Sequence, residues 1–239
     1  MQNVPLASGG VFLQYSNIDA KVGSLHGEGN ISTSGYTLGT TGTWIGNNQF
    51  YFDGLAQITS FSNDLNSKTA SRQLGHNKSA MGYALSLEAG QGFDLNPKWT
   101  LTPQAQLTFS SINLNDFHDT FKTKVHFDQS RSMKLRAGAT IDYKQKWDGD
   151  QSKREKAANL YGFLNVRQEL LGHHDYVDVA NVAFHSKNEP IWGEVGSGGS
   201  YSWDNRKSFV YGQASANTSL NNFADSYELK AKIGIKVIW

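Results

Sequence analysis

The sequence predicts an all-β protein, an antiparallel up-and-down β-barrel that crosses a membrane. Three observations predict it: apolar and polar residues alternate along ten segments, short turns alternate with long polar connections, and aromatic residues gather beside the short turns. Alternation places successive side chains on opposite faces of a strand, which suits a wall between lipid and water. No linker divides the 239 residues, so residues 1–239 are expected to form a single domain.

The ten predicted strands follow one another from residue 9 to the C-terminus. They are expected at residues 9–20, 33–46, 49–62, 79–94, 99–112, 132–147, 158–170, 191–203, 208–220 and 226–239. In the fifth segment, Leu107 and Phe109 lie on the face opposite to Gln106, and most other segments alternate as cleanly. At 158–170 and 208–220 the sequence leaves open which face is apolar.

The last of these strands has the clearest alternation and ends on an aromatic residue. Every second position from Tyr227 to Trp239 is apolar, whereas the positions between them up to Lys236 carry charges or glycine. This arrangement resembles the C-terminal assembly signal of bacterial outer-membrane β-barrels, and the residues that would form the signal are Lys232, Gly234, Val237 and Trp239. An edge strand of a soluble β-sandwich could show the same alternation, so this strand alone does not decide between the two folds.

The connections between the strands alternate between short and long. Short turns are expected at residues 46–48, 96–98 and 204–207, and long polar stretches at 21–32, 63–78, 113–131 and 171–190. Only the polar connection at 148–157 is longer than its place in the series predicts. Membrane barrels have short periplasmic turns and long external loops, so we assign the short turns to the periplasmic side.

Aromatic residues flank the short turns and the polar connection that takes the place of one. They form a predicted interfacial girdle of Trp44, Phe50, Phe93, Trp99, Trp147, Trp203 and Phe209. Amphipathic rings are most stable at the level of the lipid headgroups. Tryptophans can also close the ends of a soluble sandwich, but a soluble protein has little reason to confine them to alternate turns.

Composition excludes several other classes of protein. No run of about 18 apolar residues exists, so a transmembrane helix is excluded. A net charge of +1 gives no electrostatic reason to bind nucleic acid, and the absence of cysteine fits passage through an oxidising periplasm. The first ten residues lack the charged and apolar regions of a signal peptide, so an export signal is expected upstream.

From about residue 9 to 239 the chain resembles the β-domain, or translocator, of monomeric autotransporters (type V secretion, subtype Va). The blocks that carry the resemblance are GYTLGTTGTWIG (35–46), FYFDGLAQITSFSNDL (50–65), GYALSLEAGQGFDL (82–95), WTLTPQAQLTFS (99–110), LYGFLNVRQELLG (160–172), WGEVGSGGSYSW (192–203) and the C-terminal stretch 210–239. The order and spacing of LTPQAQL and WGEVG are specific to this resemblance. Relatives are expected in the adhesin-like group of the family rather than in its serine-protease group.

The resemblance implies a barrel of twelve strands that follows a pore helix and a long passenger. The match begins at what corresponds to the third strand, so ten of the twelve strands are expected here, in an N-terminally truncated barrel. An unclosed sheet would leave two bare edges in lipid, where each unsatisfied backbone group is costly. The sequence leaves open whether ten strands close.

The function that the resemblance implies is an outer-membrane translocator and anchor that exports its own N-terminal passenger to the cell surface, through or beside a polar lumen. The expected partners are outer-membrane lipid, the barrel-assembly machinery, periplasmic chaperones and the passenger. A monomer is expected, with no nucleic acid and no cofactor. Two alternatives remain, namely an outer-membrane channel and a barrel adhesin that binds through the loops 113–131 and 171–190.

Polar residues opposite the apolar stripe are the candidates to line the lumen. The set comprises Glu88, Gln104, Gln106, Arg136, Arg167, Glu194 and Lys230. Ionisable groups at membrane depth need water or a partner, so Glu88 and Glu194 are expected to pair with an arginine or a lysine.

No catalytic or metal-binding residues are expected. Some members of the resembled family cut themselves within the pore with lumenal carboxylates, and Glu88 or Glu194 could hold that place, but the segment to be cut is absent from this sequence. The loop motifs 116–119 (DFHD) and 173–175 (HHD) have the residue types of an acid/base site, yet loop histidines and aspartates are usually only solvated. His173, His174 and His185 lack the ligand spacing of a designed metal site.

Overall fold

A computed structural model describes most of the chain. The described residues are 6–24, 27–118, 122, 124–127, 130–148, 155–171, 174–179, 182–187, 189–203 and 208–237. Among these residues, no helix is long and apolar enough to cross a membrane.

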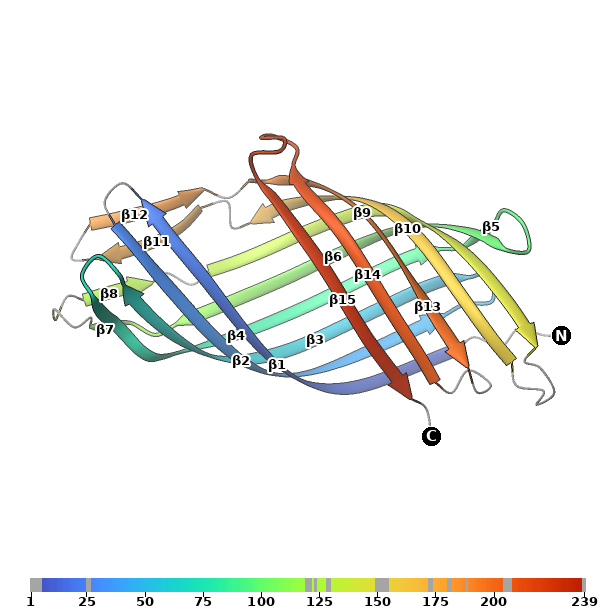
Figure 1. Ribbon diagram of the computed structural model, residues 1–239, viewed down its shortest axis with the longest axis horizontal. Coiled ribbons are helices and arrows are strands. Elements are labelled where there is room, and N and C mark those ends of the chain that lie inside the picture. Colours follow the sequence, from blue (N-terminus) through green and yellow to red (C-terminus); the bar gives the residue numbers. More distant parts are fainter. Residues whose placement is uncertain are drawn as a thin grey trace.

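Ten long strands form one antiparallel sheet in sequence order, and the sheet curls into an open half-barrel (Figure 1). They are β1 (Leu6–Ser24), β2 (Gly27–Ile45), β3 (Phe50–Ser67), β4 (Arg72–Gln91), β6 (Trp99–Leu114), β9 (Ser130–Asp148), β10 (Glu155–Leu171), β13 (Ile191–Trp203), β14 (Ser208–Ser219) and β15 (Tyr227–Val237). The two-residue strand β5 (Phe93–Asp94) pairs with β6 beside the second short turn. All ten predicted strands are present, and the predicted fold class is confirmed.

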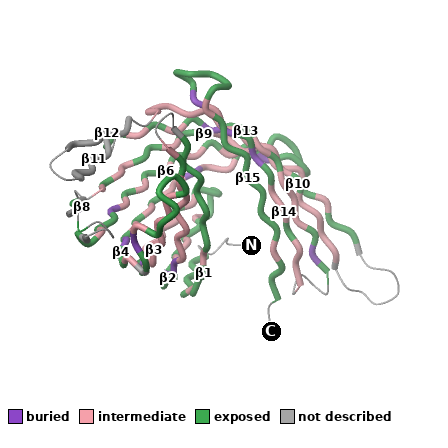
Figure 2. The backbone as a smooth tube through the Cα atoms, turned by 60° about the vertical axis from the view of Figure 1, so that its left-hand side comes forward, coloured by how far each residue is buried: buried purple, intermediate pink, exposed green. Residues whose placement is uncertain are grey.

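The two ends of the sheet are β1 and β15. Within the described residues each of them has one hydrogen-bonded neighbour, β2 and β14 respectively. Figure 2 shows both edge strands exposed along nearly their whole length, because neither is covered by a further strand. The open question of closure is therefore answered for the described residues: the ten strands form a trough rather than a closed ring.

Two of the expected long loops are in fact continuations of strands. Residues 21–32 are almost entirely strand, since β1 runs to Ser24 and β2 starts at Gly27, and β3 and β4 likewise extend through much of 63–78. Beyond the lipid both faces of a hairpin meet water, so the alternation that marks a strand in the membrane disappears. The alternation of apolar and polar residues therefore stops where the lipid ends, while the hydrogen-bonded strands continue beyond it.

The other two long loops contain a small sheet that the sequence did not predict. Its strands β7 (Phe117–His118) and β8 (Lys124–Phe127) come from 113–131, and β11 (His174–Val179) and β12 (Val182–Lys187) come from 171–190. They pair in the order β12-β11-β8-β7, so the two loops are joined to one another. Figure 1 shows this sheet at one end of the half-barrel, away from the ends where β1 begins and β15 finishes.

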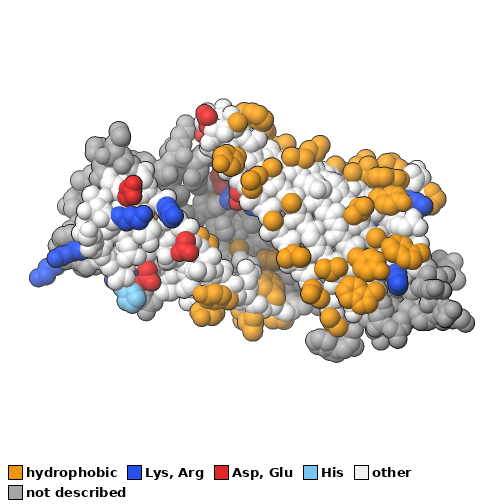
Figure 3. Space-filling model, viewed as in Figure 1, with side chains coloured by type: hydrophobic (Ala, Val, Ile, Leu, Met, Phe, Trp, Pro, Cys, Tyr) orange, Lys and Arg blue, Asp and Glu red, His pale blue; other side chains and the backbone are white. Residues whose placement is uncertain are grey.

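Burial in the large ten-stranded sheet is the reverse of that in a soluble protein. The buried side chains described are mostly Thr, Ser and Asn, whereas large apolar side chains are exposed, among them Ile233 at 84% and Leu13 at 83%. Figure 3 shows apolar side chains spread over the outer face and charged ones gathered towards the end with the small sheet. Such a surface is stable only where the surrounding solvent is itself apolar.

Candidate functional site: the polar face and the C-terminal strand

The register of the sheet brings the candidate lumen residues onto one face. Asp53 lies opposite Glu88, Glu88 opposite Gln106, Gln106 opposite Arg136, and Arg136 opposite Arg167. We call this line of residues, which crosses β3, β4, β6, β9 and β10, the polar row. Successive strand residues alternate in face, so the apolar neighbours of each member lie on the other side of the sheet.

Glu88 is held in the middle of the polar row by donors from two sides. Arg136 forms a charge-assisted hydrogen bond with it, and the Tyr51 hydroxyl donates to its Oε1 at 2.6 Å. The same hydroxyl lies 3.1 Å from Oε1 of Gln104, and Gln106 Nε2 donates to Ser86 Oγ at 2.7 Å. The expectation that Glu88 pairs with an arginine is confirmed by this geometry.

Glu194 does not follow the expected pairing. Its carboxylate accepts hydrogen bonds from Asn165 Nδ2 at 3.0 Å and from Ser215 Oγ at 3.1 Å. Arg167, a candidate partner, donates instead to Asn217 Oδ1 at 2.5 Å. Asn165 on β10 is the direct cross-strand neighbour of Glu194, and Ser215 on β14 is two residues from its other direct neighbour, Asn217. The sequence does not reveal this register, so it could not predict that neutral donors satisfy the carboxylate.

Charges of both signs gather where the polar face reaches the end with the small sheet. The Nζ of Lys230 lies 2.8 Å from Glu228 Oε2, and Arg167 lies 3.7 Å from the same oxygen. Lys134 Nζ lies 3.7 Å from Glu169 Oε2. These side chains line a cavity of about 500 Å³ together with Glu189 and Trp192. A cavity lined by charges of both signs does not select anions over cations, whereas selective pores are lined by rings of charges of one sign.

The C-terminal strand keeps its glycine for a steric reason. Gly234 on β15 lies opposite Tyr211 on β14. A Cβ placed at Gly234 would lie 2.3 Å from the Cζ and Oη of Tyr211, so the phenol ring covers the glycine. Lys232 pairs with Gln213 and Val237 with Ser208 in the same ladder, while Trp239 lies outside the described residues.

The same arrangement of a tyrosine over a glycine recurs across the polar face. Tyr51 covers Gly90, where an added Cβ would lie 2.4 Å from its ring, and Tyr161 covers Gly198 at 2.5 Å. We call these contacts, with Tyr211 and Gly234, the tyrosine–glycine contacts. Sequence reasoning missed the tyrosines, although their place on the polar face opposite a glycine of the next predicted strand could have marked them.

Six of the seven predicted girdle residues lie on the outer face near the short turns. The ring centroids of Trp44 and Phe50 are 6.2 Å apart, and Trp99 packs on Tyr143 at 5.1 Å. Tyr201 lies 6.1 Å from Trp147 and 6.0 Å from Trp203, so two tyrosines missed from the sequence join this group.

The exception among the girdle residues is Phe209. It lies opposite Ser202 and Lys236, in phase with the polar residues of β14, and therefore shares their face rather than the outer one. It belongs to 208–220, one of the two segments whose faces the sequence left ambiguous.

The loop motifs with acid and histidine residues lie only partly within the described residues. Asp116 contacts His126, which belongs to neither motif, with Oδ1 2.7 Å from Nδ1. Asp119 and His173 lie outside the described residues.

Comparisons with known proteins agree with this geometry. The autotransporter β-domain family model matches residues 5–215. The adhesin BmaC autotransporter of Brucella suis biovar 1 (strain 1330) is 42% identical over 231 residues, which are 97% of this chain and 7% of that protein. The probable autotransporter YpjA of Escherichia coli (strain K12) is 28% identical over 135 residues, 56% of this chain and 9% of that protein. This chain therefore spans less than a tenth of the length of either relative.

Two solved structures share the fold. The transport unit of the autotransporter AIDA-I from Escherichia coli aligns with a TM-score of 0.78 and 15% identity, over 100% of this chain and 78% of that one. The β-domain of the Bordetella autotransporter BrkA aligns with a TM-score of 0.65 and 15% identity, over 98% of this chain and 92% of that one. With a family model that matches most of its residues, this chain belongs to the autotransporter β-domain family, whose members are β-barrels of the bacterial outer membrane.

Proposed function

We propose that the chain is the wall of an outer-membrane translocator that anchors its parent protein and exports an N-terminal passenger to the cell surface. The observation that carries the proposal is the sheet's two-sided chemistry: a continuous polar row on the concave face and exposed apolar side chains on the other. The first face suits the passage of a hydrated polypeptide, and the second suits lipid.

The lining supports transport of an unfolded chain without strong binding. Glu88 and Arg136 neutralise one another, and Lys230 and Arg167 both lie close to Glu228. A surface with its charges already paired offers a passing peptide many weak hydrogen-bonding sites and no deep electrostatic well. The same pairing supports a structural role for Glu88, because the two donors that hold it would oppose its use as an acid or a base.

We further propose that additional strands of the parent protein pair with β1 and β15 and close the barrel. Two bare edges in lipid would leave backbone groups unsatisfied at a cost of roughly several kcal/mol each. If strands of the same polypeptide bury both edges, the barrel is a monomer. In this proposal the barrel-assembly machinery recognises the C-terminal strand, and periplasmic chaperones protect the unfolded form. The exposure of both edge strands supports this proposal.

A charge exchange in the polar row tests the translocator role. In the full-length parent, Glu88→Arg and Arg136→Glu each place like charges side by side, so surface display of the passenger is expected to fall. The exchange of both residues restores opposite charges and should restore display. Asp19→Lys, on β1 beside Ser32 and outside the polar row, is the matched control.

Two readouts separate transport from assembly. Protease accessibility of the passenger on intact cells measures export, and the change in gel mobility on heating measures barrel folding. If the single charge reversals leave a folded barrel with full display of the passenger, the polar row has no part in transport and the proposal is wrong.

A second function has one observation in its favour. The small sheet joins two loops into one ordered surface at the end of the half-barrel, and long ordered loops are often functional. Deletion of residues 113–131 and 171–190 would abolish adhesion by the barrel itself if this surface binds a host. Under the translocator proposal the same deletion leaves passenger-dependent adhesion intact.

A further inference from the structure

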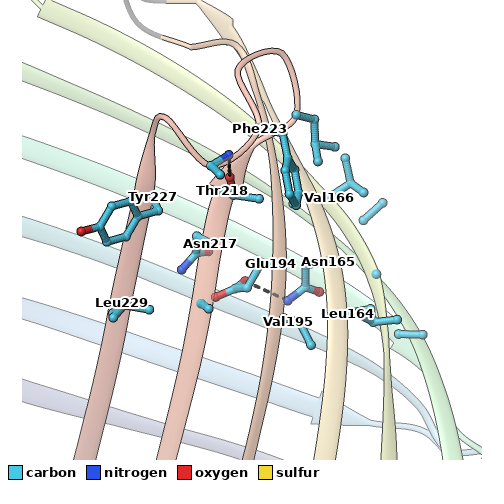
Figure 4. A pocket seen from close by; sticks show the side chains of 17 residues that line it. Leu164, Asn165, Val166, Glu194, Val195, Asn217, Thr218, Phe223, Tyr227 and Leu229 are labelled. Atoms are coloured by element: carbon cyan, nitrogen blue, oxygen red, sulfur yellow. Dashed lines mark hydrogen bonds between the residues drawn. The ribbon is translucent and has the colours of Figure 1, made fainter.

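The outer face of the sheet contains a cleft near the turn that joins β14 and β15. The cleft has a volume of about 900 Å³ and crosses β9, β10, β13, β14 and β15 (Figure 4). Its floor is made of small residues, and its walls are larger apolar side chains. The floor residues are Ala137, Ala139, Gly193 and Ala216, and the wall residues include Leu164, Val166, Val195 and Leu229. The volume is within the range of roughly 300–1,000 Å³ that small-molecule sites occupy.

A structured turn covers one end of the cleft. Ala224 N donates to Thr218 Oγ1 at 3.1 Å, and Asn222 Nδ2 donates to Glu189 Oε1 at 2.6 Å. Ser219 Oγ accepts from the backbone N of Asn222 at 3.2 Å. These bonds fix the polar side of the turn, whereas the side chain of Phe223, 74% exposed, lies against the cleft. The cleft is therefore preformed, which lowers the entropic cost of binding.

The same turn also packs on the floor of the cleft at one end. Leu220 packs on Gly193, where an added Cβ would lie 3.0 Å from the leucine Cδ2. Asn165 and Glu194 hydrogen-bond to one another, as Figure 4 shows, and their side chains are used on the polar face. Neither the Glu194 carboxylate nor the Asn165 amide is therefore available to a ligand in the cleft. The groups that remain on the outer face are mostly apolar.

We propose that this cleft binds one acyl chain of an outer-leaflet lipid, with the lipid headgroup at the level of the 220–226 turn. The cleft is continuous with the lipid-facing wall of an outer-membrane protein, so an acyl chain reaches it without leaving the bilayer. The turn belongs to the end of the sheet away from the short turns. Its place in the outer leaflet rests on the proposed function, in which the short turns are periplasmic. Phe223 and Tyr227 flank the entrance, where aromatic rings meet headgroups.

Photo-cross-linking tests this site. The full-length parent protein is purified from outer membranes. It is reconstituted in vesicles of outer-membrane phospholipid that contain a phospholipid with a diazirine on its acyl chain. After illumination, peptide mass spectrometry locates the modified residues. Cross-links concentrated on the cleft residues of β10, β13 and β14 support the proposal, whereas cross-links spread evenly over the outer wall overturn it. Protein–protein cross-links through the cleft also overturn it, because the occupant is then a second copy.

Substitutions that fill the cleft provide the second arm. Ala139→Leu with Ala216→Leu occupies the floor and should reduce cleft cross-linking about tenfold, as expected when several methylene contacts are lost. The matched control is Ala89→Leu, an alanine on the outer face of β4 and outside the cleft. Phe223→Ser removes one side of the entrance without changing the wall and should reduce cross-linking as well. Unchanged cleft cross-linking in both variants, with barrels that still shift on heating, overturns the proposal.

Discussion

Gly234→Ala is the substitution for which the structure makes the sharpest prediction. The new Cβ would lie 2.3 Å from the Cζ and Oη of Tyr211 and 2.8 Å from its Cε1, so the phenol ring must leave its place. The atoms met are the far end of a tyrosine side chain that is 42% exposed and can swing aside, so the cost lies at the low end for overpacking, about 1 kcal/mol of the free energy of unfolding. Because β15 is held by one neighbour in the described residues, the loss is expected to appear as weaker docking of the C-terminal strand.

Urea unfolding of the protein in lipid vesicles, followed by tryptophan fluorescence and by heat-dependent gel mobility, measures this loss. Gly212→Ala is the matched control, since a Cβ there meets its nearest atom, the carbonyl O of Lys232, at an ordinary 3.7 Å. Tyr211→Ala should make Gly234→Ala nearly neutral, whereas Tyr211→Phe should not, because the ring remains.

The double-mutant cycle decides whether the reasoning holds. A coupling energy of about 1 kcal/mol between the two positions is expected if the ring occupies the space that the new Cβ would take. Additive effects of Gly234→Ala and Tyr211→Ala, or a neutral Gly234→Ala in the presence of the tyrosine, would refute the steric account.

Three further predictions concern the faces of the sheet, its C-terminus and one turn. Leu107→Lys, on the outer face of β6, should lower the free energy of unfolding by about 2–4 kcal/mol, whereas Thr102→Lys on the polar face of β6 should have little effect. Urea unfolding measures both variants, and the opposite ranking would show that the faces are inverted. Trp239→Ser or deletion of residues 237–239 should stall insertion into the outer membrane, measured as the heat-shifted fraction of the protein; a normal yield would contradict the assignment of the assembly signal. Hydrogen bonds from Gln49 and Thr100 hold the pKa of Asp94, on β5 beside the second short turn, below its usual value. Its contribution to stability is therefore present above about pH 3.9, the ordinary pKa, and is lost as the pH falls through the lowered folded-state pKa; a urea midpoint with the same acid dependence in Asp94→Asn would count against this account.

Sequence alone could predict the strands in the membrane but not what lies beyond it. Alternation identifies β6 and β15 because lipid on one face forces apolar residues to every second position. Outside the bilayer that constraint is lifted, so the tips of β1 to β4 and the small sheet of β7, β8, β11 and β12 were taken for loops.

The candidate site was predictable by residue but not by partner. Alternation is enough to place Glu88 and Arg136 on the same face. The cross-strand register decides that Glu194 accepts hydrogen bonds from Asn165 and Ser215 rather than from an arginine. Register depends on contacts far apart in the sequence, and a shift by one residue reverses every face. Phe209, at the start of a segment with ambiguous faces, was assigned to the girdle because it flanks a short turn, whereas the register places it on the polar face.

The uninterrupted pairing of β1 with β2, from Leu6 opposite Ile45 to Ser24 opposite Gly27, has a mechanical consequence. In the translocator proposed above, traction on the passenger would pull along the strands, and neighbouring antiparallel strands would then slide past one another in shear. In shear the hydrogen bonds of the ladder resist together, whereas in peeling they would break one after another. Strands that continue past the apolar part of the sheet lengthen this ladder, so the extended hairpins would strengthen the proposed anchor against such traction.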